Sequence, residues 1–235
     1  RAKKLLSVAV YNHYKRINHN LDKDNGTIFR HSNHENNILR EIYRQLSESA
    51  ESDRKELMDF IDSITHWKDG KAELAGPRDM VDLADIVLKY YFHPEMGGSY
   101  SIKYVLPAVL NSSEYIQKKY SRPIYGTPQM PSRNLSEPKV WINRDPENGR
   151  IQNPYKLLPS VASHVKDVDT AASAQEDIGI KTIANGGAAL AAYSKIQFTD
   201  ETMTEALRDA LLTYCELDTL AMVFIWEYFF NECNK

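Results

Sequence analysis

The feature that most constrains this chain is a helix-forming run, Leu211–Met222, near its C-terminus. Tyr214 and Asp218 lie four residues apart in that run, so a helix places both side chains on one face, where they can address a common target. Thr199, with two acidic residues directly behind it, predicts the start of this helix. The same spacing arises by chance in helical proteins, so the alternative is a core phenol beside a solvated carboxylate.

Strand-like and helix-like segments alternate in the first half of the chain. The stretch Gly26–His31 is short, contains β-branched residues and opens with the turn pair Asn25-Gly26, which predicts a strand. A strand or turn that runs into an amphipathic helix is predicted for 78–92. Apolar residues at helical spacing predict further helices over 5–17, about 38–46, 53–64, the residues after Gly97, and 184–193. The pattern favours an α/β fold that is rich in helices and has few strands.

A long segment from about 111 to 175 loses this periodicity and carries seven prolines. Segments of this length without regular structure are usually functional or mobile, and we expect an irregular insertion. Between Lys118 and Lys156 there are eight Lys or Arg against three Asp or Glu, whereas 196–235 has two against eight. Aromatic residues such as Trp141 interleave with the basic ones, as in surfaces that stack single-stranded bases, although loop aromatics also anchor irregular segments to a core.

Composition excludes several classes of protein. The 235 residues are 42% hydrophobic, which suffices for one sizeable core, and the net charge of −3 excludes a chain that coats nucleic acid through bulk positive charge. Two cysteines form neither a disulfide framework nor a zinc pattern, and they suit a reducing, cytoplasmic compartment. No window approaches the roughly 18 apolar residues of a membrane span.

Six blocks of the chain form a recognisable order: Gly26–Asn36, Val81–Leu83, Gly98–Lys103 with Leu106-Pro107, Asn153–Tyr155, Gly187-x-Ala189 and Tyr214–Met222. Together they resemble, in family order, a bacterial family of predicted RNase H-like nuclease domains, domain of unknown function 2779. Tyr-x-x-x-Asp at 214–218 is similar to the last motif of the DEDD-type 3′–5′ exonucleases, which share that fold. The resemblance implies that 1–235 is a single RNase H-like α/β domain that carries the irregular insertion at about 111–175.

The resemblance also implies roles for individual residues. Asp218 and Glu35 would hold a divalent metal, Mg²⁺ or Mn²⁺, and Tyr214 would orient the attacking water. Lys103 would lie near a phosphate. Beside the resemblance, we expect His34, Asn36 and Trp141 as further contacts to DNA or RNA, single-stranded ends above all. Metal-assisted hydrolysis of a phosphodiester fits such carboxylates, because hard oxygen ligands suit Mg²⁺ and two ions can clamp the attacking and leaving oxygens.

One departure from the family pattern affects the expected activity. An Asp-x-Glu motif on an opening strand should precede Gly26, and the chain has none there. We therefore expect this motif and the first strands of the sheet upstream of Arg1, in the same polypeptide, and little nuclease activity from this chain by itself. The alternative is a non-catalytic nucleic-acid-binding or interaction domain of a larger protein.

Each expected site residue also has a structural interpretation. Ser32 and Glu35 match the S-x-x-E capping box, in which the glutamate reaches back to the helix N-terminus. Asp82 fits a helix N-cap better than a metal ligand. His34 is a candidate for a structural hydrogen bond, and Lys103 for a solvated helix residue.

Overall fold

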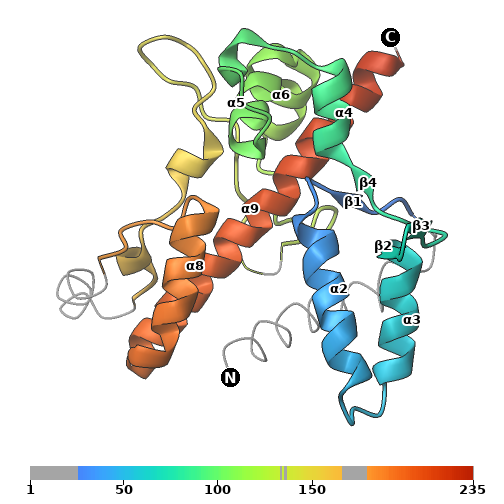
Figure 1. Ribbon diagram of the computed structural model, residues 1–235. Coiled ribbons are helices and arrows are strands. Elements are labelled where there is room, and N and C mark those ends of the chain that lie inside the picture. The colour runs from blue at the N-terminus through green and yellow to red at the C-terminus, as the bar shows by residue number, and fades with distance from the viewer. Residues whose placement is uncertain (1–25, 133, 135–136, 166–178, 235) are drawn as a thin grey trace. The chain divides into compact units, whose positions relative to one another are not determined.

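The computed structural model describes residues 26–132, 134, 137–165 and 179–234. The chain divides into two compact units, unit 1 (Arg1–Tyr91) and unit 2 (Phe92–Lys235). The four described strands, which form two small sheets, lie in unit 1, and the elements described in unit 2 are helices. Together the described residues form a helix-rich α/β protein (Figure 1). This agrees with the fold class expected from the sequence at that coarse level. The helix predicted for 5–17 lies outside the described residues.

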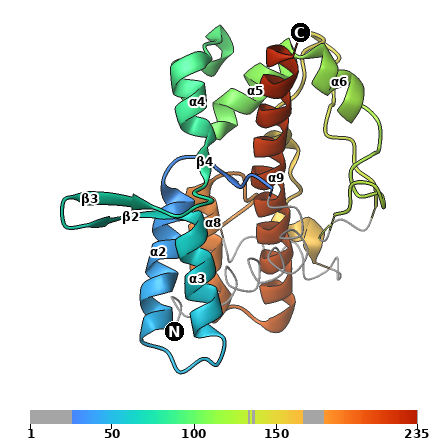
Figure 2. The same cartoon turned by 90° about the vertical axis from the view of Figure 1, so that its right-hand side faces the viewer.

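Two helices form the core of unit 1. Helices α2 (His34–Ser47) and α3 (Arg54–Ile64) lie side by side, joined by a short loop (Figures 1 and 2). Their apolar residues recur at helical spacing, so each helix has one apolar face, and these faces pack together. Full burial of a Leu or Ile side chain contributes about 1.5–3 kcal/mol relative to exposure. The buried cluster consists of Leu39, Ile42, Leu46, Leu57, Ile61, Ile64 and Met80.

Unit 1 also contains two short pairs of strands. Strand β1 (Phe29–Arg30) is parallel to β4 (Val81–Asp82), with Phe29 opposite Val81. A parallel pair needs a long crossover connection, and here that connection holds α2 and α3. The antiparallel hairpin of β2 (His66–Asp69) and β3 (Ala72–Ala75) turns at Gly70, whose φ of 60° favours glycine. The hairpin extends away from the helix pair (Figure 2).

Helix α4 (Leu83–Tyr90) ends unit 1 and begins directly after β4. Asp82 is its N-cap, and its Oδ1 accepts a 2.9 Å hydrogen bond from the backbone N–H of Ala84. The capping role expected for Asp82 is therefore confirmed. The S-x-x-E capping box is not formed, because Asn33 rather than Ser32 is the N-cap of α2 and Ser32 has a φ of 74°.

Unit 2 is built around one long helix. Helix α9 (Glu201–Cys233) packs against α5 (Ile102–Ser112), α6 (Glu114–Tyr120) and α8 (Gly186–Lys195), as Figure 1 shows. Two 3-10 helices, η1 (Pro94–Met96) and η4 (Ile196–Phe198), precede α5 and α9 respectively. Asp200 is the N-cap of α9, with Oδ1 accepting from the N–H of Met203, so the helix starts one residue later than Thr199 predicts.

The described residues between α6 and α8, here called the irregular segment, are mostly without regular structure and include two further 3-10 helices, η2 (Pro154–Leu157) and η3 (Val161–His164). Helix α6 lies within the stretch from 111 onward that was expected to be irregular. Trp141 is 1% exposed and anchors the segment, with the ring of Tyr125 packed edge-on against its indole at 6.2 Å. The structural role expected of loop aromatics therefore describes Trp141, and its burial does not suit base stacking. Among the described residues, no helix is long and apolar enough to cross a membrane.

Candidate active site

Four residues from three different elements meet on one side of α9. Tyr214 and Asp218 share a face of that helix, as their spacing predicts, and Tyr214 is only 5% exposed. Lys103 lies in the first turn of α5, and Tyr155 lies in η2. Unit 2 thus brings together three residues that the sequence singled out, with a fourth that it did not assign to the site.

Lys103 lies at the centre of this cluster. Its Nζ donates a 3.1 Å hydrogen bond to the hydroxyl of Tyr214 and lies 3.8 Å from Oδ1 of Asp218. The same ammonium faces the rings of Tyr155 and Tyr214 at 4.9 and 5.4 Å from their centroids, within the range of cation–π attraction. The solvated position considered for Lys103 is therefore not what the structure shows, because its charge is directed into the cluster.

The two tyrosines stay protonated at any physiological pH. Burial, followed by the negative charge of Asp218 and a hydrogen bond to it, raises the pKa of Tyr214 well above its ordinary value. The same causes, in the same order, raise the pKa of Tyr155. Both phenols therefore act as hydrogen-bond donors toward the carboxylate.

The side chain of Asp218 is 34% exposed, so a ligand can reach it, but its Oδ1 already accepts a 2.5 Å hydrogen bond from the hydroxyl of Tyr155. Carboxylate oxygen is the ligand type that Mg²⁺ prefers. Within the described part of the chain, however, no group of three or more His, Cys, Asp or Glu side chains is placed to share a metal ion. One carboxylate beside an ammonium does not fit a two-metal site, so the cluster by itself is incomplete for that purpose.

Glu35 belongs to unit 1, in the first turn of α2. Burial raises the pKa of its carboxyl above the ordinary value, although backbone hydrogen bonds from Glu35 itself and from His31 act in the opposite direction. Its Oε2 is buried and has no hydrogen-bond partner among the described residues. A buried carboxylate oxygen without a partner is costly, which makes Glu35 a candidate for a role beyond packing. The convergence of Glu35 with Asp218 stays a prediction.

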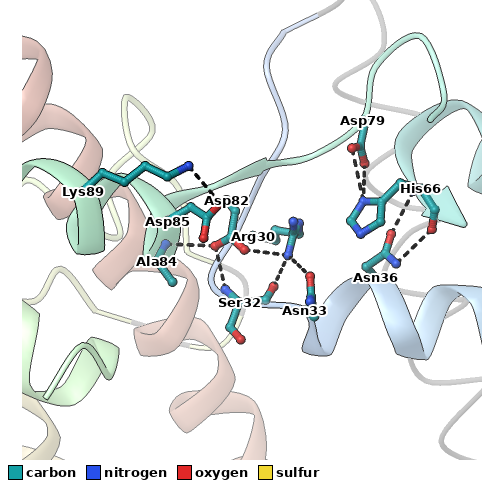
Figure 3. A network of polar contacts seen from close by, with 10 residues as sticks. All are labelled: Arg30, Ser32, Asn33, Asn36, His66, Asp79, Asp82, Ala84, Asp85 and Lys89. Atoms are coloured by element: carbon teal, nitrogen blue, oxygen red, sulfur yellow. Dashed lines mark hydrogen bonds and ion pairs between the residues drawn. The ribbon is translucent and has the colours of Figure 1, made fainter. Parts of the chain in front are cut away.

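A polar network holds the loop that precedes Glu35 (Figure 3). Arg30 forms a largely buried ion pair with Asp82, with 2.7 Å between Nη1 and Oδ2. The same Nη1 donates to the carbonyl of Ser32 and to Oδ1 of Asn33, both at 2.6 Å. Oδ1 of Asp82 also accepts from the backbone N–H of Ser32 at 2.8 Å. These bonds fix the start of α2, and with it the position of Glu35.

The other nucleic-acid contacts expected in unit 1 differ in accessibility. His34 is exposed at the first position of α2. Asn36 is 4% exposed, and its amide exchanges two 3.0 Å hydrogen bonds with the backbone N–H and C=O of His66. The ring of His66 in turn meets the carboxylate of Asp79 at 3.1 Å (Figure 3). The structure gives Asn36 a packing role that joins α2 to β2, and leaves His34 accessible to a ligand.

The site residue that sequence reasoning missed is Tyr155. Its stretch Asn153-Pro-Tyr155 is one of the blocks of the resemblance, and an Asn before a Pro is typical of a short helical start, but neither signal gives Tyr155 a role at the site. Oδ1 of Asn153 accepts from the backbone N–H of Tyr155 at 3.1 Å, which caps η2. No sequence pattern predicts that this turn lies beside α9.

Comparison with known proteins supports part of the resemblance. A family model described as Domain of unknown function (DUF2779) matches residues 8–101, less than half of the chain. The matched stretch includes Glu35 and ends two residues before Lys103, so it does not extend to Tyr214 or Asp218. Residues 8–101 are therefore similar to this family. No curated protein and no solved structure gave a match.

Proposed function

We propose that this chain is part of a nucleic-acid hydrolase of the RNase H-like, 3′–5′ exonuclease type. The observation that carries the proposal is the convergence of Lys103, Tyr214 and Asp218 on one side of α9. Two of these residues belong to the motif of the final helix and the third comes from a block more than 100 residues earlier. A phenol, a carboxylate and an ammonium in contact are suited to hydrolysis of a phosphodiester.

Each group has a defined chemical capacity. The phenol of Tyr214 is held by the ammonium of Lys103, so its hydroxyl has a fixed direction in which to orient a water molecule. The carboxylate of Asp218 accepts hydrogen bonds and can hold a cation or a proton. Lys103 supplies the positive charge that an incoming phosphate needs, and removal of such a group costs catalysis because it acts in a partly dehydrated site.

The proposal requires Mg²⁺ or Mn²⁺ and further carboxylates. Asp218 would contribute one oxygen ligand, and Glu35, with its buried and unpartnered Oε2, is the candidate for a second. The remaining acids would come from the opening motif that the family pattern places before Gly26. A protein without those acids is expected to hydrolyse nucleic acid poorly, and one that holds them to do so with a divalent ion.

DNA or RNA with single-stranded ends is the proposed substrate, and a cytoplasmic location is proposed with it. His34 is an accessible candidate contact in unit 1, and Lys103 is the candidate in unit 2. Two basic residues of the stretch expected to bind nucleic acid are engaged within the protein: Lys119 of α6 pairs with Glu227 at 2.7 Å, and Lys139 lies 4.1 Å from the ring centroid of Trp141. This weakens the case for a broad basic binding surface along that segment.

A non-catalytic nucleic-acid-binding domain is the second candidate function. It is favoured by the ammonium of Lys103 beside Asp218, because that charge neutralises the acid without a metal ion. In this alternative the fold binds nucleic acid and has no chemistry. Binding would then persist when Asp218 is replaced by Asn.

A nuclease assay on the full-length protein separates these functions. Labelled single-stranded DNA and RNA are incubated with Mn²⁺ and the wild type, Asp218→Asn, Tyr214→Phe or Asp209→Asn. Asp209 is the matched control, an exposed acid on the same helix. We expect metal-dependent cleavage that a chelator abolishes, that both site variants lose and that Asp209→Asn keeps. Binding without cleavage by all four proteins would favour the non-catalytic domain.

A further inference from the structure

We propose that Tyr155 is a positioning residue that fixes the carboxylate of Asp218 for the reaction. The inference rests on the proposed function and adds a residue that lies outside the motif of α9 and outside the matched residues 8–101. Tyr155 comes from the irregular segment between α6 and α8, which gives this segment a role at the site.

The contact with Asp218 is direct, and the tyrosine that makes it is buried. The hydroxyl of Tyr155 donates to Oδ1 of Asp218 over 2.5 Å, and the tyrosine is 3% exposed. A donor in such a place holds one oxygen of the carboxylate in a single direction, so that the orientation of the whole group is set. A fixed orientation of the carboxylate speeds a reaction in which this group must hold a reactant in the geometry for attack.

Tyr155 is itself held by the other members of the cluster. Its ring lies 6.3 Å from that of Tyr214 and accepts the ammonium of Lys103 over its face at 4.9 Å. Asn153 links η2 to α5, because its Nδ2 donates to the carbonyl of Lys103 at 3.3 Å and its Oδ1 accepts from the N–H of Tyr155. A side chain this constrained can transmit its own position to Asp218.

A second tyrosine of the same segment makes the contrast clear. The hydroxyl of Tyr125 donates over 2.5 Å to Oε1 of Glu216, which also accepts from Ser132, while Oε2 accepts from Asn134. Glu216 lies two residues before Asp218, on a different side of α9. All three donors to Glu216 come from the irregular segment, so this glutamate anchors that segment to α9. Asp218 accepts from one residue of the segment and also lies beside Lys103 and Tyr214, the other residues of the proposed site.

The test compares Tyr155→Phe with Tyr125→Phe in the full-length protein. Each variant removes one hydroxyl from a buried ring of the same segment, and each leaves a carboxylate on α9 without that donor. We measure kcat and KM for cleavage of labelled single-stranded DNA or RNA with Mn²⁺, together with the thermal midpoint. We expect Tyr155→Phe to lower kcat about 10- to 100-fold with KM within about twofold, as for other groups that orient a reacting ligand. Tyr125→Phe should keep the wild-type kcat and lose thermal stability to a similar or greater degree.

A wild-type kcat in a folded Tyr155→Phe protein overturns the inference and leaves the proposed function standing. An equal loss of kcat in Tyr125→Phe has the same consequence. A wild-type protein with no nuclease activity overturns the proposed function and the role of Tyr155 with it. If Tyr155→Phe does not fold, Asn153→Ala replaces it, because this change keeps the hydroxyl and removes the bonds that place it. A fall in kcat then supports the inference, and an unchanged kcat contradicts it.

Discussion

The ammonium of Lys103 donates a 3.1 Å hydrogen bond to the hydroxyl of Tyr214, joining the first turn of α5 to the middle of α9. The bond links two elements whose packing forms the centre of unit 2. The bond also sets the direction of the other hydrogen bond of this phenol. Because the hydroxyl oxygen accepts from the ammonium, its hydrogen is donated to the carboxylate of Asp218.

We predict that Lys103→Met lowers kcat for single-stranded substrates about 10²-fold, a loss typical of a removed electrostatic donor. Methionine keeps the apolar stem and removes the charge. Lys103→Arg, which keeps the charge but changes its shape, should lose less. Steady-state kinetics with Mn²⁺ measure both variants, and a Lys103→Met protein with wild-type kcat would contradict the role of the ammonium.

We predict that Glu35→Gln stabilises unit 1 at neutral pH and lowers nuclease activity. The amide is neutral, so burying it costs less than burying a carboxylate whose Oε2 has no partner among the described residues. Opposite effects on stability and activity are typical of functional residues. Urea unfolding and the nuclease assay measure the two effects, and the exposed Glu48→Gln serves as a control. A loss of stability would show instead that Glu35 is a structural residue.

We predict that Asn36→Ala lowers the free energy of unfolding by about 1–3 kcal/mol, because the N–H and C=O of His66 lose their partners in a buried position. The exposed Asn37→Ala, on the same helix, should change it little. Urea unfolding of both variants decides the structural part. Affinity for single-stranded DNA, measured below the unfolding transition, decides whether Asn36 also contacts nucleic acid, which its burial argues against.

We predict that His164→Gln makes the protein less sensitive to mild acid. Burial lowers the pKa of His164 below its ordinary 6.5, partly offset by the charge of Asp209, and its buried Nε2 has no hydrogen-bond partner among the described residues. The unfolded chain therefore binds this proton more tightly, and the stability that the neutral ring provides is present above pH 6.5 and lost as the pH falls toward the lowered value. Thermal midpoints between pH 7.5 and 5 should fall less steeply in the variant. Equal slopes would contradict the prediction.

We predict that Gly76→Ala is severely destabilising. A Cβ at Gly76 would lie 2.0 Å from the backbone oxygen of Asp62, which cannot move without shifting α3. Overpacking of this kind costs about 1–3 kcal/mol or more. Gly70→Ala is the matched control, since its Cβ would meet nothing within 4 Å and only its φ of 60° opposes the change, at about 1–2 kcal/mol. Chemical unfolding should rank Gly76→Ala well below Gly70→Ala.

Sequence patterns predicted the elements that bury an apolar face. Leu39, Ile42 and Leu46 are buried along α2 as their spacing requires, and the helix of Tyr214 and Asp218 forms as expected. The hairpin β2–β3 was missed because the residues of β3 are all exposed, so no alternation marks that strand, and only the turn at Gly70 gave a signal.

Local rules failed where distant residues intervene. Ser32 would cap α2 by its sequence context, but Arg30 binds its carbonyl and Asp82 binds its N–H, and the helix begins beyond it. The contact of Tyr155 with Asp218 likewise depends on the tertiary structure, because 63 residues separate the two. A pattern within one element does not predict which turn of an irregular segment reaches that element.

The irregular segment contacts α9 on two sides, because the hydroxyl of Tyr125 donates to Glu216 and that of Tyr155 donates to Asp218. Successive residues of an α-helix are about 100° apart around its axis, so these two carboxylates point in widely different directions. Rotation of α9 about its axis by one residue position, about 100°, would break both contacts together. The two contacts therefore oppose rotation of α9 about its axis, and with it a change in the direction of the Asp218 carboxylate.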